Sequence, residues 1–163
     1  MSQATAPKIS ILGDGISTFE GYTPKVGSFY SPSYASYSGF NTAEGTWWMQ
    51  AIEQLGGRFL CNNSFTGSYV CYTGHYSAAL PGRIRTLATE TEKPDVIFIY
   101  TGLNDAANAV PTDLFQRDYE EMLSRVQKFF PEANVWVGTL MVGDAPTGGR
   151  PDDPAAGKPP NFR

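Results

Sequence analysis

Three short apolar runs, rich in Val and Ile, do most to limit the folds open to this chain. They are "KISIL" (8–12), "DVIFIY" (95–100) and "NVWVGTL" (134–140). None alternates cleanly between apolar and polar residues, which is typical of parallel strands that are buried on both faces. A weaker candidate, "RFLCN" (58–62), follows a pair of glycines. The runs therefore predict four strands of a parallel sheet.

Helical patterns separate these strands. Apolar residues recur at helical spacing in three segments, at 46–55, 77–89 and 111–130. In the last segment we expect Thr112 as the N-cap and Asp113 in the first turn, where a negative charge is favoured. The alternating order predicts a three-layer α/β/α sandwich with a parallel, flavodoxin-like sheet and right-handed crossovers. Ligands of such sheets bind beyond the carboxyl ends of the strands.

Two stretches show no period. Residues 21–45 are rich in Tyr, Ser and Gly, and we interpret them as a long loop over the cleft entrance. Residues 143–163 are rich in Gly and Pro, so we expect a lid loop or a frayed tail there. A length of 163 residues fits a single domain, 1–163, that is incomplete at its C-terminal side.

Charge and composition disfavour several classes of partner. The net charge is −4 and no cluster of Lys and Arg stands out, so we expect no nucleic-acid partner. The longest apolar runs are about five residues, too short for a membrane span. The first residues, "MSQATAPK", lack the apolar core of a signal peptide. We therefore expect a cytoplasmic protein by default, and a secreted mature form stays open.

Two cysteines and one histidine are too few for a metal site. Cys61, Cys71 and His75 do not supply four zinc ligands at these spacings, so no metal is expected. We interpret the cysteines as reduced thiols, with a bridge between them as the alternative.

The loops after the strands carry the candidate chemistry, in "GDGIS" (13–17), "NNSFTGS" (62–68) and "TGLND" (101–105). The backbone N–H groups of Gly15 and Gly67 and the side-chain amide of Asn104 would together form a three-donor oxyanion hole. Each such donor typically contributes ~3 kcal/mol in the transition state of acyl transfer. Three neighbouring polar residues are expected to support them: Asp14, Asn63 and Asp105.

The order and spacing of these motifs resemble the SGNH, or GDSL-like, hydrolase superfamily. The resemblance covers about residues 8–141 and includes "ILGDGISTFEGY", "NNSFTGS", "KPDVIFIYTGLND" and "FFPEANVWVGTL". It implies a three-layer sandwich with a five-stranded parallel sheet and hydrolysis of acyl or acetyl esters. It also implies a Ser nucleophile at position 15, oxyanion roles for Gly67 and Asn104, and a late Asp-x-x-His motif that supplies the base. No cofactor is implied.

The chain departs from this pattern at two points. Position 15 is Gly, and Ser17, inside the following turn, is expected to point elsewhere. The sequence contains no Asp-x-x-His; its one histidine is His75, which with Trp48 is a weaker cleft candidate. Loss of a triad nucleophile typically costs about a millionfold in rate. We therefore expect an ester-hydrolase scaffold that is inactive as written, with four of the family's five strands.

Three readings of these departures stay open. The chain can be part of a longer enzyme, whose further residues would add the fifth strand and the histidine. It can be a pseudoenzyme that binds a small-molecule ester or glycan without cutting it. It can also perform a different chemistry in which Asp14 or Asp105 acts as acid or base, although both carboxylates suit structural roles at helix starts better. The sequence gives no indication of oligomeric state.

Overall fold

The computed structural model describes residues 5–24, 27–34, 39–72 and 76–140. Its centre is a parallel sheet of four strands in the order β2-β1-β3-β4. The strands are β1 (Lys8–Gly13), β2 (Arg58–Ser64), β3 (Val96–Tyr100) and β4 (Asn134–Val137). The predicted parallel strands are confirmed, although the last one ends at Val137 and does not continue to 140.

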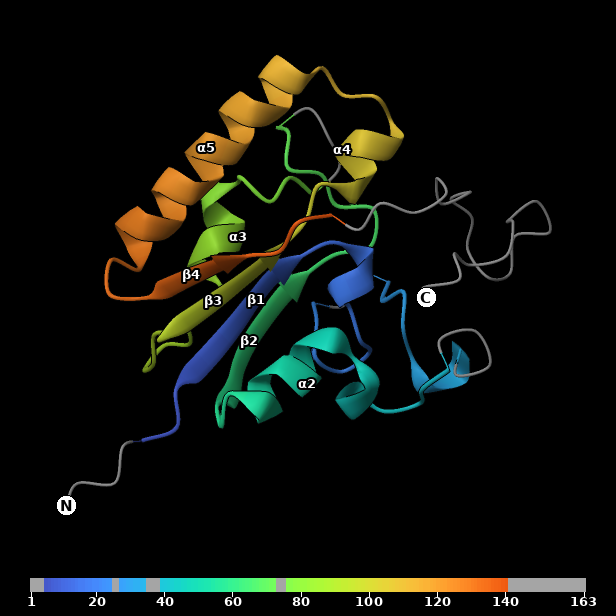
Figure 1. The fold of residues 1–163 in the computed structure, drawn as a ribbon, viewed down its shortest axis with the longest axis vertical. Coiled ribbons are helices and arrows are strands. Elements are labelled where there is room, and N and C mark those ends of the chain that lie inside the picture. The colour runs from blue at the N-terminus through green and yellow to red at the C-terminus, as the bar shows by residue number, and fades with distance from the viewer. Residues whose placement is uncertain (1–4, 25–26, 35–38, 73–75, 141–163) are drawn as a thin grey trace.

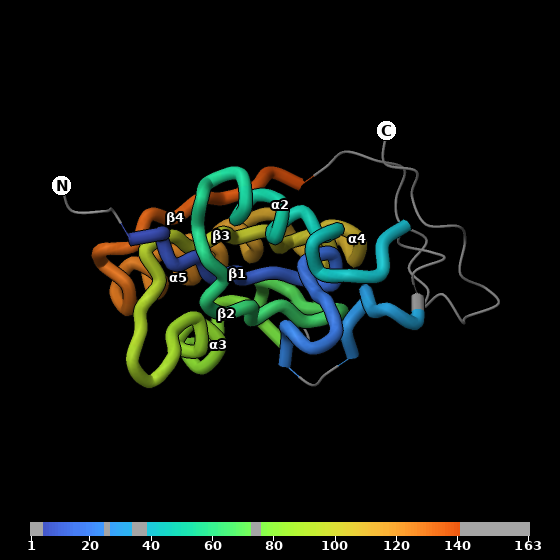
Figure 2. The backbone as a smooth tube through the Cα atoms, turned by 90° about the horizontal axis from the view of Figure 1, so that it is seen from below, coloured from blue at the N-terminus to red at the C-terminus, as the bar shows by residue number. Residues whose placement is uncertain are grey.

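Helices cover both faces of the sheet, as predicted (Figure 1). On one face lies α2 (Trp47–Gln54), and on the other lie α3 (Pro81–Arg85) and α5 (Thr112–Phe129). Figure 2 shows the backbone from below, a view in which α2 and α5 overlap the strands. A short helix, α4 (Leu103–Ala107), follows β3, and three 3-10 turns complete the elements: η1 (Gly15–Ser17), η2 (Pro32–Tyr34) and η3 (Ala43–Gly45).

The helix predicted over 77–89 is wrong for most of its length, because only Pro81–Arg85 is α-helical. Before it, the Ala78 N–H bonds the Tyr69 carbonyl, which holds this backbone against a loop. After it, the N–H groups of Thr86 and Leu87 bond carbonyls three residues back, as in successive 3-10 turns. Turns of that spacing also bring apolar side chains to one face, so the pattern alone could not separate the two structures.

The N-cap prediction for the last helix is also wrong. Thr112 is the first helical residue of α5, and Pro111 takes the cap position without any side-chain hydrogen bond. Asp113 does lie in the first turn, as expected. The proline side chain has no oxygen that could accept an N–H of the first turn, so the helix begins without an Asx-type or Ser/Thr-type cap.

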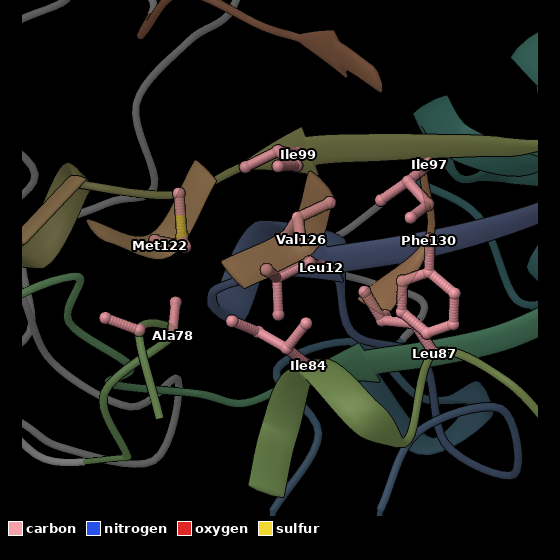
Figure 3. Packing of buried hydrophobic residues seen from close by; sticks show 10 residues of the cluster. Leu12, Ala78, Ile84, Leu87, Ile97, Ile99, Met122, Val126 and Phe130 are labelled. Atoms are coloured by element: carbon pink, nitrogen blue, oxygen red, sulfur yellow. The ribbon is translucent and has the colours of Figure 1, made fainter. Parts of the chain in front are cut away.

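Two apolar cores lie on opposite faces of the sheet. On the α3 and α5 side, Leu12, Ile84, Ile97 and Val126 are all completely buried (Figure 3). On the α2 side, the core contains Ile9, Ile11, Trp48, Ile52 and Phe98. Successive residues of β1 and β3 therefore point to opposite cores, which explains why these strands are apolar without alternation.

The described parts of 21–45 form a loop that packs on the α2-side core through Tyr30 and Phe40. The predicted tail over 143–163 lies outside the described residues. Within the described ranges, no helix combines the length and apolar character needed to cross a bilayer.

The strand register brings the loops to one edge. Gly13 at the end of β1 pairs with Ser64 on one side and Tyr100 on the other. The three neighbouring strands β2, β1 and β3 therefore end level with one another. The loops that follow them begin side by side, where ligands of parallel sheets bind.

Candidate active site

The loop after β1 turns sharply at Asp14. The Asp14 carboxylate caps η1 by accepting the Ile16 N–H at 3.2 Å, and the Asp14 N–H donates to the Tyr100 carbonyl at 3.3 Å. Gly15 comes next. A Cβ built there would meet nothing closer than Thr66 Cα, at 3.6 Å. The position therefore has room for a side chain, and it lies directly against the loop that follows β2.

The loop after β2 makes a tight turn at Gly67. The Ser68 N–H donates to the Phe65 carbonyl at 3.1 Å, and Gly67 has φ +74, a conformation that glycine adopts without strain. Asn104, in the first turn of α4 after β3, reaches the same turn and donates its side-chain amide to the Ser68 carbonyl at 2.8 Å. The structure thus brings the three predicted donor loops together.

Unpaired polar groups gather at this edge of the sheet. In the part of the chain that the structure describes, neither the Gly15 nor the Gly67 N–H donates a hydrogen bond. Buried side-chain oxygens without a partner among these residues lie there too, on Asp14, Ser64, Thr66 and Thr101. Buried polar groups are normally satisfied, so their concentration here indicates a place for water or a ligand.

Asp14 has an unusual electrostatic setting. Its side chain is 1% exposed, and burial raises its pKa from 3.8 to about 6, against the opposing hydrogen bond from the Ile16 N–H. The positive charge of Arg83 lowers this pKa and the negative charge of Asp105 raises it, both to a smaller extent. Burial and the Asp14 charge in turn raise the pKa of Tyr30.

The other two supporting residues have structural partners. Asp105 accepts the Val70 N–H at 2.8 Å and the Cys71 N–H at 3.0 Å, one on each carboxylate oxygen. Asn63 accepts from Arg83 at 2.8 Å through its side-chain oxygen. Both residues hold loops in place, and the Asp105 carboxylate does so through N–H groups 35 and 34 residues away rather than at its own helix start.

The weaker cleft candidates fare differently. Trp48 is fully buried and packs against Tyr22 and Phe59, so its proposed place in the cleft is wrong; its large apolar surface is used in the α2-side core. His75 lies outside the described residues. Ser17 does point elsewhere, because it is buried and its hydroxyl accepts from the Trp47 indole at 3.2 Å.

No metal-binding group of three or more His, Cys, Asp or Glu exists among the described residues. The two cysteines are free thiols, as the preferred interpretation has it. Burial, together with the neighbouring Asp105 and Asp118, raises the pKa of Cys71 to about 12, so this thiol is not a nucleophile at neutral pH.

A groove of 580 Å³ begins beside the site, on the α2 side of the sheet. Ile16, the residue after Gly15, lines one part of it, and Trp47, Tyr100 and Trp136 line others. The tryptophan of α2 that lines this groove is Trp47 and not its neighbour Trp48, which was the predicted cleft residue. The helical period of 3.6 residues does not show which of two adjacent tryptophans faces the core and which faces the groove, unless the position of the neighbouring strand is known.

The comparison with known proteins agrees with this architecture. The sequence model of the family described as GDSL-like Lipase/Acylhydrolase matches residues 7–141. The chain belongs to this family. No curated protein matches the sequence significantly.

Two crystal structures of proteins described as GDSL-like lipases are similar to this family member over most of its length. That from Bacteroides ovatus ATCC 8483 has a TM-score of 0.71 and 28% identity, over 82% of this chain and 72% of its own. That from Bacteroides uniformis ATCC 8492 has a TM-score of 0.69 and 29% identity, over 81% and 70%. The GDSL-like fold predicted from the motifs is confirmed.

Proposed function

We propose that the protein is an ester-hydrolase scaffold that binds the carbonyl group of an acyl ester between the loops after β1, β2 and β3. The observation that carries the proposal is the contact of these loops. Gly15 lies against Thr66, and Asn104 bonds Ser68, so the three segments that carry the predicted donors meet at the end of the sheet, which supports a shared binding place. Membership of the GDSL-like lipase/acylhydrolase family supports the ester class.

The arrangement favours binding over fast hydrolysis. The N–H groups of Gly15 and Gly67, with the second hydrogen of the Asn104 amide, would donate to a carbonyl oxygen and more strongly to a tetrahedral oxyanion. Glycine at 15 supplies no oxygen for an acyl-enzyme. Oxyanion donors and binding alone retain about 10³–10⁴ over the uncatalysed rate in triad enzymes. We therefore expect slow hydrolysis at most.

A non-catalytic glycan-binding role is the second candidate, and the groove favours it. Aromatic side chains of Tyr30, Trp47, Tyr100 and Trp136 line a space that begins at the residue after Gly15. Flat aromatic rings present apolar faces to sugar rings and polar atoms at their edges. An acetylated sugar would place its acetyl group at the donors and its ring in this groove.

The test is a titration of the ¹⁵N-labelled protein with acetamide, a stable carbonyl compound, followed through the amide resonances. We expect Gly15 and Gly67 to shift first and Asn104→Ala to weaken binding several-fold. Asn134→Ala is the matched control, because Asn134 is exposed at the opposite end of the strands. If acetamide shifts neither glycine at any concentration, the site does not bind carbonyl groups and the proposal fails.

A further inference from the structure

Arg83 is the most extensively bonded buried charge in the described part of the chain. It is only 7% exposed, yet its guanidinium makes five hydrogen bonds. Nε donates to Asn63 Oδ1 at 2.8 Å, and Nη2 donates to the Gly13 and Asn63 carbonyls at 3.0 and 2.6 Å. Nη1 donates to Ser68 Oγ at 2.5 Å and to the Tyr76 carbonyl.

These bonds join the three loops of the candidate site. Gly13 is two residues before Gly15, so one bond fixes the start of the first loop. Ser68 follows Gly67 and receives the Asn104 amide, so a second bond fixes the turn on which the other two donors depend. A planar fork with five N–H groups suits this task, whereas an ammonium group has three donors and no fixed plane.

The acceptors of Arg83 are all neutral oxygens. No ion pair within 4.0 Å among the described residues includes Arg83. Burial lowers the pKa of Arg83 to about 9, and the negative charge of Asp14 opposes part of this lowering. Arg83 therefore remains protonated at neutral pH, and no carboxylate among the described residues lies within 4.0 Å of its guanidinium.

A buried cation without a contacting anion creates a positive potential, which favours any negative group nearby. The donors above it are N–H groups, which also favour negative charge. We propose that Arg83 is a positioning residue that fixes the three donors relative to one another, and that its charge gives the site a preference for an anion, a carboxylate product or an oxyanion, over a neutral carbonyl. This inference rests on the proposed function and names the charge of its preferred ligand.

The test compares acetate with acetamide, two probes of similar shape and different charge, at pH 7.5. The readout is the ratio of the acetamide Kd to the acetate Kd, measured from the Gly15 and Gly67 amide shifts. Wild-type protein is expected to prefer acetate, and Arg83→Met to lower this ratio at least fivefold. Arg83→Lys should keep at least half the preference, because it keeps the charge, but bind both probes at least threefold more weakly, because it loses the fork.

Arg85→Met is the matched control, since Arg85 is exposed on the same short helix and stacks on Phe129. It should leave both dissociation constants within twofold of wild type. A loss of stability alone would not change the preference between two probes in a folded protein. A ratio lowered less than fivefold by a folded Arg83→Met overturns the electrostatic role. Arg83→Lys binding both probes within threefold of wild type overturns the positioning role.

Asp14→Asn keeps the test decisive if the Arg83 variants do not fold. Removing the negative charge that faces Arg83 should raise the preference for acetate at least threefold, and a smaller rise overturns the electrostatic role. Ser68→Ala should weaken both probes at least twofold, and a smaller effect overturns the positioning role. Wild-type protein that binds acetamide without preferring acetate refutes this inference alone. Wild-type protein that binds neither probe refutes the proposed function.

Discussion

Two glycines separated by one residue have opposite roles at the start of the site. A Cβ at Gly13 would lie 2.6 Å from the Cβ and Oγ of Ser17 and 2.8 Å from Ser64 Oγ, all parts of short buried side chains. At Gly15 the nearest atoms are at ordinary contact distance, 3.6 Å and beyond. Glycine is therefore required by packing at 13 and not at 15.

We expect Gly15→Ser and Gly15→Ala to unfold at temperatures close to that of wild type. Gly13→Ala should lose about 1–3 kcal/mol, as overpacking typically costs. Gly15→Ser should hydrolyse 4-nitrophenyl acetate no faster than Gly15→Ala, since the sequence has no Asp-x-x-His motif to supply the base. Fast turnover by Gly15→Ser that His75→Ala abolishes would contradict this and identify His75 as the base.

The Asp14 carboxyl should make stability depend on pH in an uncommon direction. Because its pKa is raised in the folded state, from 3.8 to about 6, the folded protein binds more protons than the unfolded chain between these values. Its contribution therefore favours folding below about pH 4 and is lost as pH rises through 6. The full effect corresponds to about 3 kcal/mol.

Asp14→Asn removes this proton binding while keeping a capping side chain. The variant should be more stable than wild type at pH 8, by up to about 3 kcal/mol, and the gap should close as pH falls toward 4. Urea unfolding of both proteins across this range is the measurement. A gap that stays constant with pH would show that Asp14 titrates normally.

Among the elements, α4 is tied to the loop after β2 by two side chains, Asn104 and the more deeply buried Asp105. Both Asp105 oxygens accept backbone N–H groups, from Val70 and Cys71, and the residue is 2% exposed. Replacing one oxygen by an NH₂ group in Asp105→Asn leaves a buried N–H without its acceptor. We expect a loss of roughly 2 kcal/mol in the free energy of unfolding.

Asp113→Asn is the comparison for that variant, because Asp113 is exposed in the first turn of α5. Its loss should stay below about 1 kcal/mol, the typical value for a charge at a helix start. Equal losses in the two variants would mean that the bonds from Asp105 add nothing to stability beyond its charge.

The elements also show where sequence patterns stop being informative. The buried strands were predictable, because a parallel sheet covered on both faces needs unbroken runs of Val, Ile and Phe. The segment around α3 was not, since Leu80, Ile84 and Leu87 suit either a helix or successive 3-10 turns. The candidate donors at Gly15, Gly67 and Asn104 could be proposed from their position after strands, but nothing local marks Arg83 as buried. Arg83 can be buried because neutral oxygens from segments distant in the sequence accept its hydrogen bonds.

At the scale of the molecule, the sheet joins two separate apolar cores. Met122 belongs to the α5 side and Ile52 to the α2 side, and both are at most 3% exposed. Because β1 and β3 contribute side chains to both cores, we expect the cores to unfold together. Met122→Ala and Ile52→Ala should each cost about 2–5 kcal/mol.

The check is urea unfolding of these variants, followed by tryptophan fluorescence and by far-UV circular dichroism. The two signals should change together in one transition. Leu55→Ala is the control, with a smaller effect expected because Leu55 is 41% exposed. If fluorescence, which reports the α2 side, changes before the helical signal, the two cores are independent.

Finally, the reactivity of the buried Cys71 thiol can report how often the candidate site opens. Its side chain is fully buried and its N–H is held by Asp105, whereas Cys61 is partly exposed. A thiol reagent in solution can therefore reach Cys71 only in the moments when this segment detaches from α4. The rate at which the Cys71 thiol reacts gives the frequency of these openings. The lifetime of the assembled site can therefore be measured at a sulfur atom outside the proposed donors.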